Sequence, residues 1–250
     1  LRPVIEIMYA DFYTLIFDPI VNHAAKTHFM SGGQFCCPIT VRLPEGSGTG
    51  HGAQHTQSPE ALFMNAIGLK IVAPSNPSDA YHLLRASIRD NNPVLFFEHK
   101  LLYDVEGEIE TKGLEIGKAK VLQEGKDVTI ISYSHAVRTA LDTAKILEQQ
   151  GKSCTVIDLC TLNPLDSQTI LTNVQRTGRV AIIQDPNGIG GVSSQVCATI
   201  CQDKKPFDSL KCQVMQLCGK ETPIPFSKDL EAATIPSSDE CARQILTLFE

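Results

Sequence analysis

Residues 127–159 read DVTIISYSHAVRTALDTAKILEQQGKSCTVIDL. The stretch begins and ends with an apolar run rich in β-branched residues, at Asp127–Ser134 and Cys154–Leu159, and residues 136–150 between them show helical spacing of apolar positions. A buried strand, an amphipathic helix and a second buried strand make the unit of a parallel sheet covered by helices on both faces. The stretch therefore predicts an α/β fold.

The same alternation continues on both sides of this unit. Further strands are expected at Val4–Ile7, Pro38–Arg42, Leu69–Ala73, Val94–Glu98, Arg179–Gln184 and Val214–Leu217. Further helices are expected at residues 11–30, 58–65, 76–90, 166–176, 191–202 and 238–249. Ser58 and Asn76 each precede a proline and are expected to cap their helices, whereas Pro19 predicts either a kink in the first one or two shorter helices.

A charged connection divides the chain. Residues 98–127 hold 13 charged side chains in 30 positions, interspersed with glycines, which is typical of a surface segment. We expect a first domain at residues 1–103, a linker at 104–126 and a second domain at 127–250. Because Pro3–Ile7 reads as a strand at once, the first domain is expected to lack its N-terminal part.

Composition and charge exclude several classes of protein. The 250 residues carry 22 basic and 28 acidic side chains, a net charge of -6, with no basic run, which argues against nucleic-acid binding. No apolar stretch is long enough to span a bilayer. The nine cysteines contain no CxxC pair, so a reducing compartment and a chain that is not secreted are expected. Cys197 and Cys201, four apart on a predicted helix, favour core packing over a metal site.

The segment GSGTGHGAQHTQ, residues 46–57, is the most unusual in the chain. It follows a predicted strand, and loops at the carboxyl ends of parallel strands are where ligands bind. A functional role for His55 or His51 and a merely flexible turn are both compatible with these residues. The glycines lack the neighbours of a P-loop or a Rossmann site.

The polar turn at residues 90–93 also has two interpretations. It is explained by the end of a helix, yet its carboxylate, amide and carbonyl oxygens are suitable ligands for a cation.

Several stretches, in order along nearly the whole chain, carry a resemblance to a known family. They are RPVIEIM (2–8), MSGGQ (30–34), GAQHTQSPE (52–60), GLKIVAP (68–74), IRDNNPV (88–94), FEHKLLY (97–103), EGKDVTI (124–130), DLCTLNPLD (158–166), TPIPF (222–226) and Leu230-Glu231. The chain resembles the β subunit of the E1 component of 2-oxo acid dehydrogenase complexes, thiamine-diphosphate enzymes of the transketolase-like group. The resemblance implies two successive domains with mainly parallel sheets flanked by helices: an incomplete pyrimidine-binding domain and a transketolase C-terminal-type domain.

The resemblance also implies roles for individual residues. Phe12 matches the aromatic beside the cofactor's pyrimidine ring, and Met8 is a second candidate for that pocket. His55 matches the active-site histidine, while His51 is expected to support the loop. A structural K⁺ is implied at the carbonyls of Ile39, Ser87 and Ile88 and the side chains of Asp90 and Asn92.

The implied cofactor is thiamine diphosphate, shared with another subunit. The β subunit holds the aminopyrimidine half, and the diphosphate with its Mg²⁺ belongs to the α subunit, whose Gly-Asp-Gly signature followed by paired Asn is absent from this sequence. The glutamate that activates the cofactor is expected upstream of Leu1. The implied partners are the E1 α subunit, in a heterotetramer of two α and two β subunits, and the E2 lipoyl acyltransferase.

The implied reaction is oxidative decarboxylation of a 2-oxo acid with reductive acylation of lipoyl-E2. Met30–Phe35 and Ala53–His55 favour the pyruvate-specific members, and Ser58–Ala61 favours the branched-chain ones. The implied compartments are the mitochondrial matrix, the plastid stroma and the bacterial cytoplasm.

Two further hypotheses belong to other classes. Departures from the family pattern at Cys160, Asp185–Pro186 and Gln216 motivate a non-catalytic assembly subunit of the same fold. A self-contained transketolase-type enzyme would need a diphosphate-binding domain earlier on the same chain.

Overall fold

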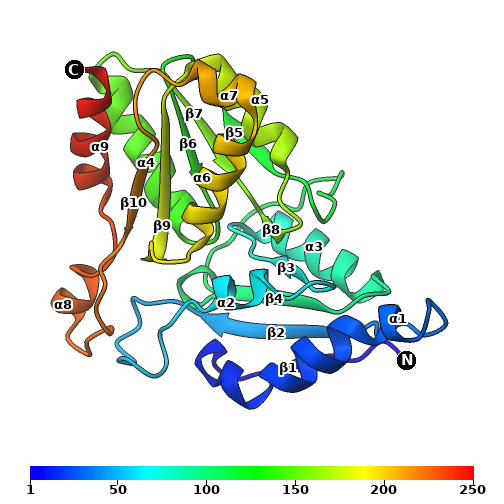
Figure 1. Ribbon diagram of the computed structural model, residues 1–250. Coiled ribbons are helices and arrows are strands. Elements are labelled where there is room, and N and C mark those ends of the chain that lie inside the picture. The colour runs from blue at the N-terminus through cyan, green and yellow to red at the C-terminus, as the bar shows by residue number, and fades with distance from the viewer. The chain divides into compact units, whose positions relative to one another are not determined.

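The computed structural model describes residues 1–250, and they form two compact units (Figure 1). Unit 1 comprises Leu1–Gly117, Cys160–Leu165 and Pro223–Glu231. Unit 2 comprises Lys118–Leu159, Asp166–Thr222 and Ala232–Glu250. Each unit has one five-stranded, mostly parallel sheet, which confirms the predicted α/β class.

The sheet of unit 1 has the strand order β1-β2-β4-β3-β8. Its strands are β1 (Val4–Glu6), β2 (Thr40–Glu45), β3 (Lys70–Val72), β4 (Val94–His99) and β8 (Thr161–Asn163). The first four run parallel, and β8 pairs antiparallel with β3. Phe96 and Phe97 of β4 are both buried and, as neighbours in a strand, face opposite sides of the sheet. Both faces of the sheet are therefore core.

Each face of that sheet is covered by helical segments. On one face, Leu83 of α3 (Pro77–Arg89) packs in a cluster with Val72, Val94 and Phe96. On the other, Phe63 of α2 (Glu60–Met64) lies with its ring centroid 6.2 Å from that of Phe97.

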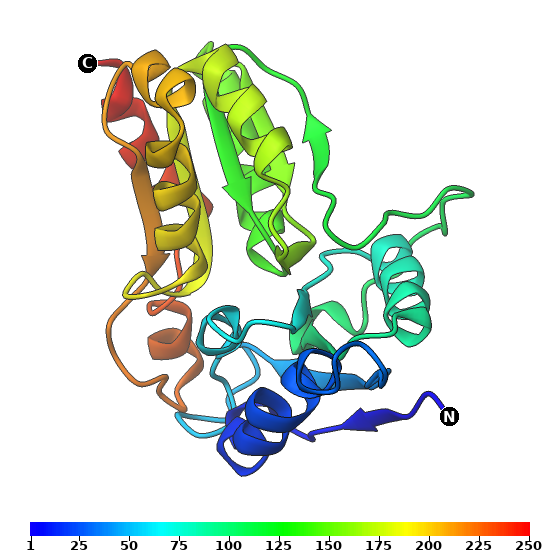
Figure 2. The ribbon, with the colours of Figure 1, turned by 45° about the vertical axis from the view of Figure 1, so that its right-hand side comes forward.

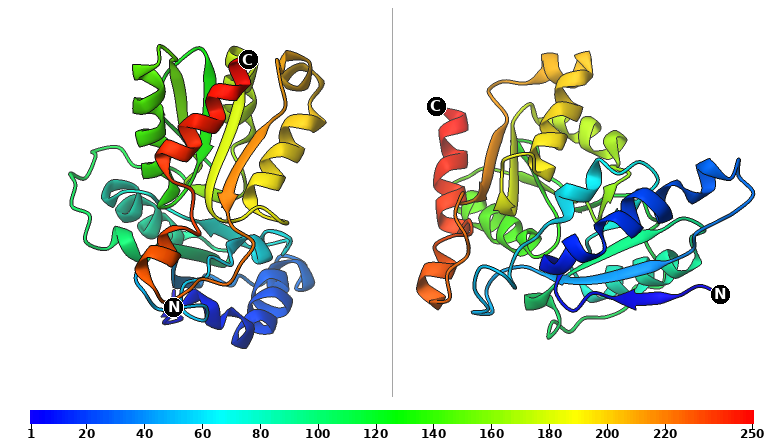
Figure 3. Two further views of the ribbon diagram at one scale, coloured as in Figure 1. Left: turned by 90° about the vertical axis from the view of Figure 1, so that its left-hand side faces the viewer. Right: turned by 60° about the horizontal axis from the view of Figure 1, so that its bottom comes forward.

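The region predicted as one helix over residues 11–30 is a chain of short turns (Figure 3). The segments are η1 (Ala10–Leu15), η2 (Pro19–His23), η3 (Ala24–Lys26) and α1 (Thr27–Met30). A new segment begins at Pro19, because proline has no N–H to continue the preceding turn. The predicted break is confirmed.

The caps of the next two helices differ. The Asn76 side chain accepts the N–H of Asp79 at 2.9 Å, which confirms it as the cap of α3. The Ser58 prediction is wrong: α2 begins after Pro59 and no side chain caps it.

Unit 2 has the strand order β10-β9-β6-β7-β5. The strands are β5 (Lys120–Gln123), β6 (Val128–Ser132), β7 (Cys154–Asp158), β9 (Val180–Asn187) and β10 (Met215–Gly219). All pairs are parallel except β5 with β7. On one face lie α4 (Ala136–Gln149) and α9 (Ser238–Leu246), followed by η5 (Thr247–Phe249), and on the other α5 (Ser167–Thr177), α6 (Val192–Gln202) and α7 (Lys204–Ser209) (Figure 2).

The predicted strand–helix alternation is confirmed in both units, and four short elements were not predicted. They are β5 and β8, α7, and α8 (Lys228–Ala232); a 3₁₀ turn, η4 (Lys100–Leu102), also follows β4. The domain limits 1–103, 104–126 and 127–250 stay a prediction, but residues 160–165 and 223–231, from the later half of the chain, belong to unit 1. No helix is both long and apolar enough to pass through a bilayer.

Candidate functional site

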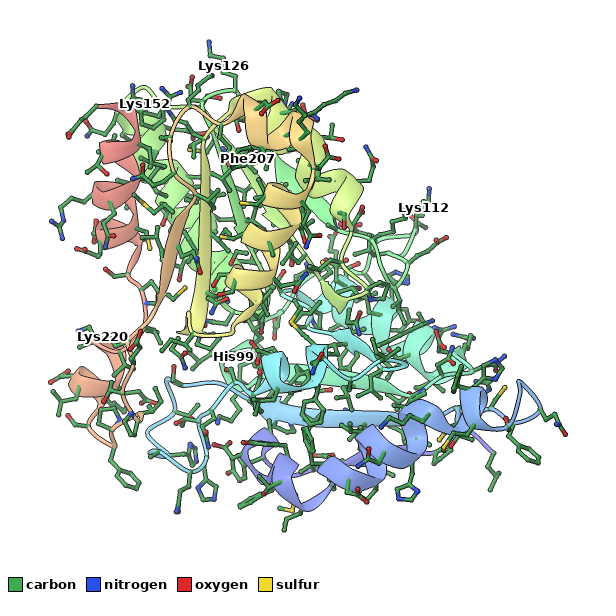
Figure 4. The ribbon with its side chains drawn as sticks, viewed as in Figure 1. His99, Lys112, Lys126, Lys152, Phe207 and Lys220 are labelled. Atoms are coloured by element: carbon green, nitrogen blue, oxygen red, sulfur yellow. The ribbon has the colours of Figure 1, made fainter.

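The glycine- and histidine-rich loop at residues 46–57 follows β2 and returns to its own start. The N–H of Gly46 donates to the carbonyl of Gln57 at 3.3 Å, which closes the loop. Gly46 has a φ of +91°, and a Cβ there would lie 2.1 Å from the ring of His99, at the end of β4 (Figure 4). Only glycine fits this position.

His55 stands between two aromatic rings. The Tyr9 ring centroid lies 4.7 Å from that of the imidazole and the Phe12 centroid 5.4 Å, both in edge-to-face arrangements. The backbone of His55 is fixed by its N–H, which donates to Gly52, and by its carbonyl, which accepts the Lys100 ammonium. Neither ring nitrogen of His55 has a hydrogen-bond partner on the chain, so both are available to a ligand.

The other predicted cofactor residues lie near this cluster. Phe12 is 39% exposed and presents ring surface next to His55. Met8 precedes Tyr9 in sequence and is 75% exposed, and the rings that contact His55 are those of Tyr9 and Phe12. His51 is exposed, and its Nδ1 lies 2.7 Å from Thr49 Oγ1 within the same loop.

A half-buried ammonium anchors the far side of the loop. Lys100 donates to the His55 carbonyl and lies over the ring of Tyr9, with 5.3 Å from Nζ to the centroid. Burial lowers the pKa of Lys100, although the carboxylates of Asp11, Glu45 and Glu231 oppose that shift. The cation is thus balanced by acidic groups of the same unit.

Asp11 supports the end of the loop. Its Oδ1 accepts both the backbone N–H and the side-chain amide of Gln57, each at 3.0 Å. Its Oδ2 is buried and has no hydrogen-bond partner. Asp11 thereby joins the segment that carries Phe12 to the loop that carries His55.

Sequence reasoning predicted His55 and Phe12 but did not name as site residues Tyr9, Asp11, Lys100 and Glu231, which the structure places against them or against the loop. The available signal was proximity in sequence for Tyr9 and Asp11, which lie between the predicted Met8 and Phe12. Lys100 and Glu231 lie in stretches that carried the resemblance, yet nothing in the sequence connects either to residues 46–57.

Four of the five residues predicted to bind K⁺ lie in the last turn of α3 or just after it, and the fifth, Ile39, is hydrogen-bonded to the first residue of β4. The Ile39 carbonyl accepts the N–H of Val94, and Ser87 and Ile88 are in the last turn of α3. Asp90 Oδ1 accepts the backbone and side-chain amides of Asn92.

Two cationic side chains, Lys70 and Arg2, already bind oxygen atoms of these residues. Lys70 donates to Asp90 Oδ2, and Arg2 donates to the Ile88 and Asp90 carbonyls. Burial raises the pKa of Asp90, but hydrogen bonds from Lys70 and Asn92 outweigh it and leave that pKa below its usual range.

The three departures from the family pattern lie apart from this loop in sequence. Cys160 is buried with a φ of +52°, and its carbonyl accepts the N–H of Ala73 at 2.9 Å. Asp185 Oδ2 lies 2.9 Å from Nδ1 of His135. Gln216 is exposed on the edge strand β10.

Comparison with family models gives two matches. Residues 1–106 match the transketolase pyrimidine-binding domain, and residues 117–241 match the transketolase C-terminal domain. The loop, Tyr9, Phe12 and Lys100 all fall within the first match, and Glu231 within the second.

Comparison with curated proteins gives relatives along almost the whole chain. The pyruvate dehydrogenase E1 component subunit beta of Rickettsia felis is 41% identical over 96% of this chain and 74% of its own length. The acetoin:2,6-dichlorophenolindophenol oxidoreductase subunit beta of Cupriavidus necator is 39% identical over 97% and 72%. The mitochondrial pyruvate dehydrogenase E1 component subunit beta-2 of Oryza sativa is 39% identical over 97% and 66%.

Comparison with solved structures supports the same fold. A split-gene transketolase, described as an inactive β4 tetramer, aligns with a TM-score of 0.81 at 20% identity over 99% of this chain and 75% of its own.

Proposed function

We infer the function from the family: this chain belongs to the family of E1 component β subunits, because it matches the transketolase pyrimidine-binding and C-terminal domains and is 41% identical to a pyruvate dehydrogenase E1 component subunit beta. We propose that it is the β subunit of a pyruvate dehydrogenase E1 component, active together with an α subunit in a heterotetramer. The proposed reaction is the oxidative decarboxylation of pyruvate, with transfer of the acetyl group to the lipoyl arm of an E2 partner.

The residues around His55 fit the pyrimidine half of thiamine diphosphate. The exposed face of Phe12 and the ring of Tyr9 offer flat apolar surface to an aromatic heterocycle. The diphosphate and its Mg²⁺ are proposed to sit on the α subunit. When bound, the cofactor supplies the electron sink that decarboxylation requires.

His55 is the residue proposed to handle protons. Its two ring nitrogens have no hydrogen-bond partner on the chain, so the imidazole can donate to or accept from a bound substrate. The edge-to-face rings of Tyr9 and Phe12 hold its plane and limit access of water. This free imidazole on an anchored loop is the observation that carries the proposal.

The test is turnover by the α and β subunits expressed together. We expect thiamine-diphosphate-dependent decarboxylation of pyruvate that falls at least about a hundredfold in His55→Ala, since general acid–base groups contribute about 10²–10⁴ in rate. His23→Ala is the control, because His23 is exposed and pairs only with Asp18. An unchanged rate in His55→Ala would refute the proposed role of that residue.

A second substrate has a specific observation in its favour. Acetoin oxidoreductase β subunits from two bacteria match this chain at 39% identity, close to the pyruvate dehydrogenase subunits. The assay therefore includes acetoin with 2,6-dichlorophenolindophenol, and 2-oxoisovalerate for the branched-chain alternative. Turnover of one of these alone would change the substrate and keep the site. A well-assembled complex that turns over none of the three would establish a non-catalytic assembly subunit.

The exposed apolar surface near the start of the chain is proposed to bind the α subunit. Besides Met8 and Phe12, the large apolar side chains that are exposed in the first 35 residues are Leu1, Val4, Ile5, Leu15, Phe17, Phe29, Met30 and Phe35. Such a concentration is typical of an interface with another protein. The proposed compartment is a bacterial cytoplasm, a mitochondrial matrix or a plastid stroma, and relatives from bacteria and plant mitochondria support the first two.

The K⁺ site is proposed with the donors predicted for it. The carbonyls of Ile39 and Ser87 each accept one backbone N–H and keep a second lone pair. If K⁺ binds there, KCl is expected to raise the melting temperature of the complex above its value in equal NaCl. The difference should vanish in Asp90→Asn; equal melting in both salts would refute the site.

A further inference from the structure

Residues 223–231 bind the loop that carries His55. We call Pro223–Glu231 the strap; it belongs to unit 1, although the family model that covers it is the C-terminal one. The strap contacts the loop through two residues, Glu231 and Phe226.

Glu231 binds two backbone groups of the loop. The N–H of Gly48 donates to Oε1 at 2.7 Å, and the N–H of Gly50 donates to Oε2 at 2.9 Å. The Glu231 side chain is buried, with 1% of the residue exposed. Hydrogen bonds from N–H groups to a buried carboxylate are about twice as strong as neutral ones.

Phe226 covers the next part of the loop. A Cβ at Gly52 would lie 2.6 Å from the Phe226 ring, so the ring rests directly on the glycine backbone. Gly52 is followed at once by the segment that leads to His55, whose N–H donates to the Gly52 carbonyl. The strap therefore holds the part of the loop that precedes His55 in sequence.

The loop needs such support because of its own composition. Gly46, Gly48, Gly50 and Gly52 all have positive φ values, and glycine loses more backbone freedom on ordering than other residues. Lys100 holds the loop only at the His55 carbonyl and Asp11 only at Gln57. The middle of the loop has Glu231 as its anchor.

We propose that Glu231 is a positioning residue, which holds residues 48–52 so that the His55 imidazole stays between Tyr9 and Phe12. The consequence for catalysis rests on the proposed function, whereas the consequence for loop order does not. Glu231 acts through the loop and touches neither His55 nor the two rings in the contacts described above.

The test compares Glu231→Gln with Asp229→Asn in the complex of α and β subunits. A glutamine offers one acceptor and turns an N–H group toward the second glycine N–H, so one of the two bonds is lost. Asp229 lies on the same short helix but is exposed, which makes it a matched control. Phe226→Ala, at an exposed ring, is a second variant that leaves the carboxylate intact.

The readout is amide hydrogen exchange of the peptide 46–57, measured without substrate. We expect exchange at Gly48 and Gly50 to rise about tenfold or more in Glu231→Gln, to rise less in Phe226→Ala and to stay unchanged in Asp229→Asn. The β4 peptide, 94–99, should exchange as in the wild type. Equal loop exchange in Glu231→Gln and wild type would overturn the proposal, and so would faster exchange throughout unit 1, which would indicate a general structural role.

Turnover then separates this inference from the proposed function. In Glu231→Gln we expect kcat to fall about tenfold with the KM for substrate unchanged, because a displaced imidazole affects chemistry more than binding. Faster loop exchange with an unchanged kcat would overturn the positioning role. If loop exchange responds as expected while the wild-type complex turns over no substrate, the strap holds the loop and the proposed function fails.

Discussion

The site is built on a balance of charge around a single ammonium. Lys100 lies half-buried with Asp11, Glu45 and Glu231 in its field, and it donates to the backbone carbonyl of His55, the residue proposed to handle protons. Its contact with His55 spans 45 positions, and those of Glu231 with the loop span 181 and 183. Partners so distant in sequence become visible only when the fold joins them, which is why sequence reasoning reached His55 and Phe12 and stopped there.

Lys100→Met is expected to lower the free energy of unfolding by about 1–3 kcal/mol, because the His55 carbonyl loses its donor and the nearby carboxylates lose their cation. Urea denaturation measures this decrease in the free energy of unfolding. Lys112→Met is the control, since Lys112 is exposed (Figure 4), and it should change stability by less than about 0.5 kcal/mol.

Comparison of the wild type with Lys100→Met also predicts how the free energy of unfolding changes with pH. The pKa of Lys100 is lowered in the folded chain, so the unfolded chain binds more protons between that lowered pKa and the unfolded value of 10.5. The unfolding free energy of the wild type relative to Lys100→Met should therefore increase as pH rises through this window. A difference that is flat or decreasing there would contradict the assignment.

Gly46→Ala is expected to cost about 3 kcal/mol, because the new methyl group would overlap the His99 ring and φ is +91°. Gly151→Ala separates the two effects. Gly151 also has a positive φ, +72°, but open space around it, so its cost should be about 1 kcal/mol. Thermal or urea unfolding of the two variants should show that gap; equal costs would mean that His99 moves freely aside.

At the level of elements, the long and periodic ones were predictable and the short ones were not. The buried strands β6 and β7 carry a continuous apolar signal. Two short strands form only because a neighbouring strand offers backbone groups for hydrogen bonding: β8, of three residues, pairs with β3, and β5, within a charged stretch, pairs with β7. The predicted cap at Ser58 failed for a related reason, since a proline at the next position sets φ but does not decide where the helix begins.

Asn76→Ala is expected to lower stability by about 1 kcal/mol, because α3 loses the side-chain acceptor for the N–H of Asp79. Ser58→Ala should change stability by less than about 0.5 kcal/mol, since Ser58 caps nothing. Chemical denaturation of both variants, side by side, tests whether Ser58 is a cap. A loss of stability in Ser58→Ala equal to that in Asn76→Ala would show that Ser58 caps α2 after all.

At the level of the whole molecule, exposed apolar side chains are unevenly distributed along the chain. Leu15 is 78% exposed near the start, in a region rich in such residues, whereas Phe207 on α7 is 52% exposed with few of them nearby in sequence (Figure 4). Composition alone predicts no such asymmetry, because each residue by itself is an ordinary apolar side chain in an amphipathic pattern.

Leu15→Asp is expected to weaken binding to the α subunit by about tenfold or more, because a charge would be placed in an apolar interface. Phe207→Asp should leave binding unchanged. Co-purification followed by titration of the α subunit measures both, and melting curves of the free β subunit show whether either variant has lost its fold. An unchanged affinity for Leu15→Asp would place the α subunit elsewhere.

The interleaving of unit 1 sets an order of events during synthesis. Its sheet lacks an edge strand until residue 163 has been made, and its loop lacks the Glu231 anchor until residue 231 has been made. Domains generally fold as units as they emerge, but here unit 1 includes two segments, residues 160–165 and 223–231, that are made after much of unit 2. A nascent chain in which residue 165 has emerged but residue 223 has not yet been made would hold all five strands of the unit 1 sheet and an unanchored histidine loop, so the loop becomes ordered later than the sheet that carries it.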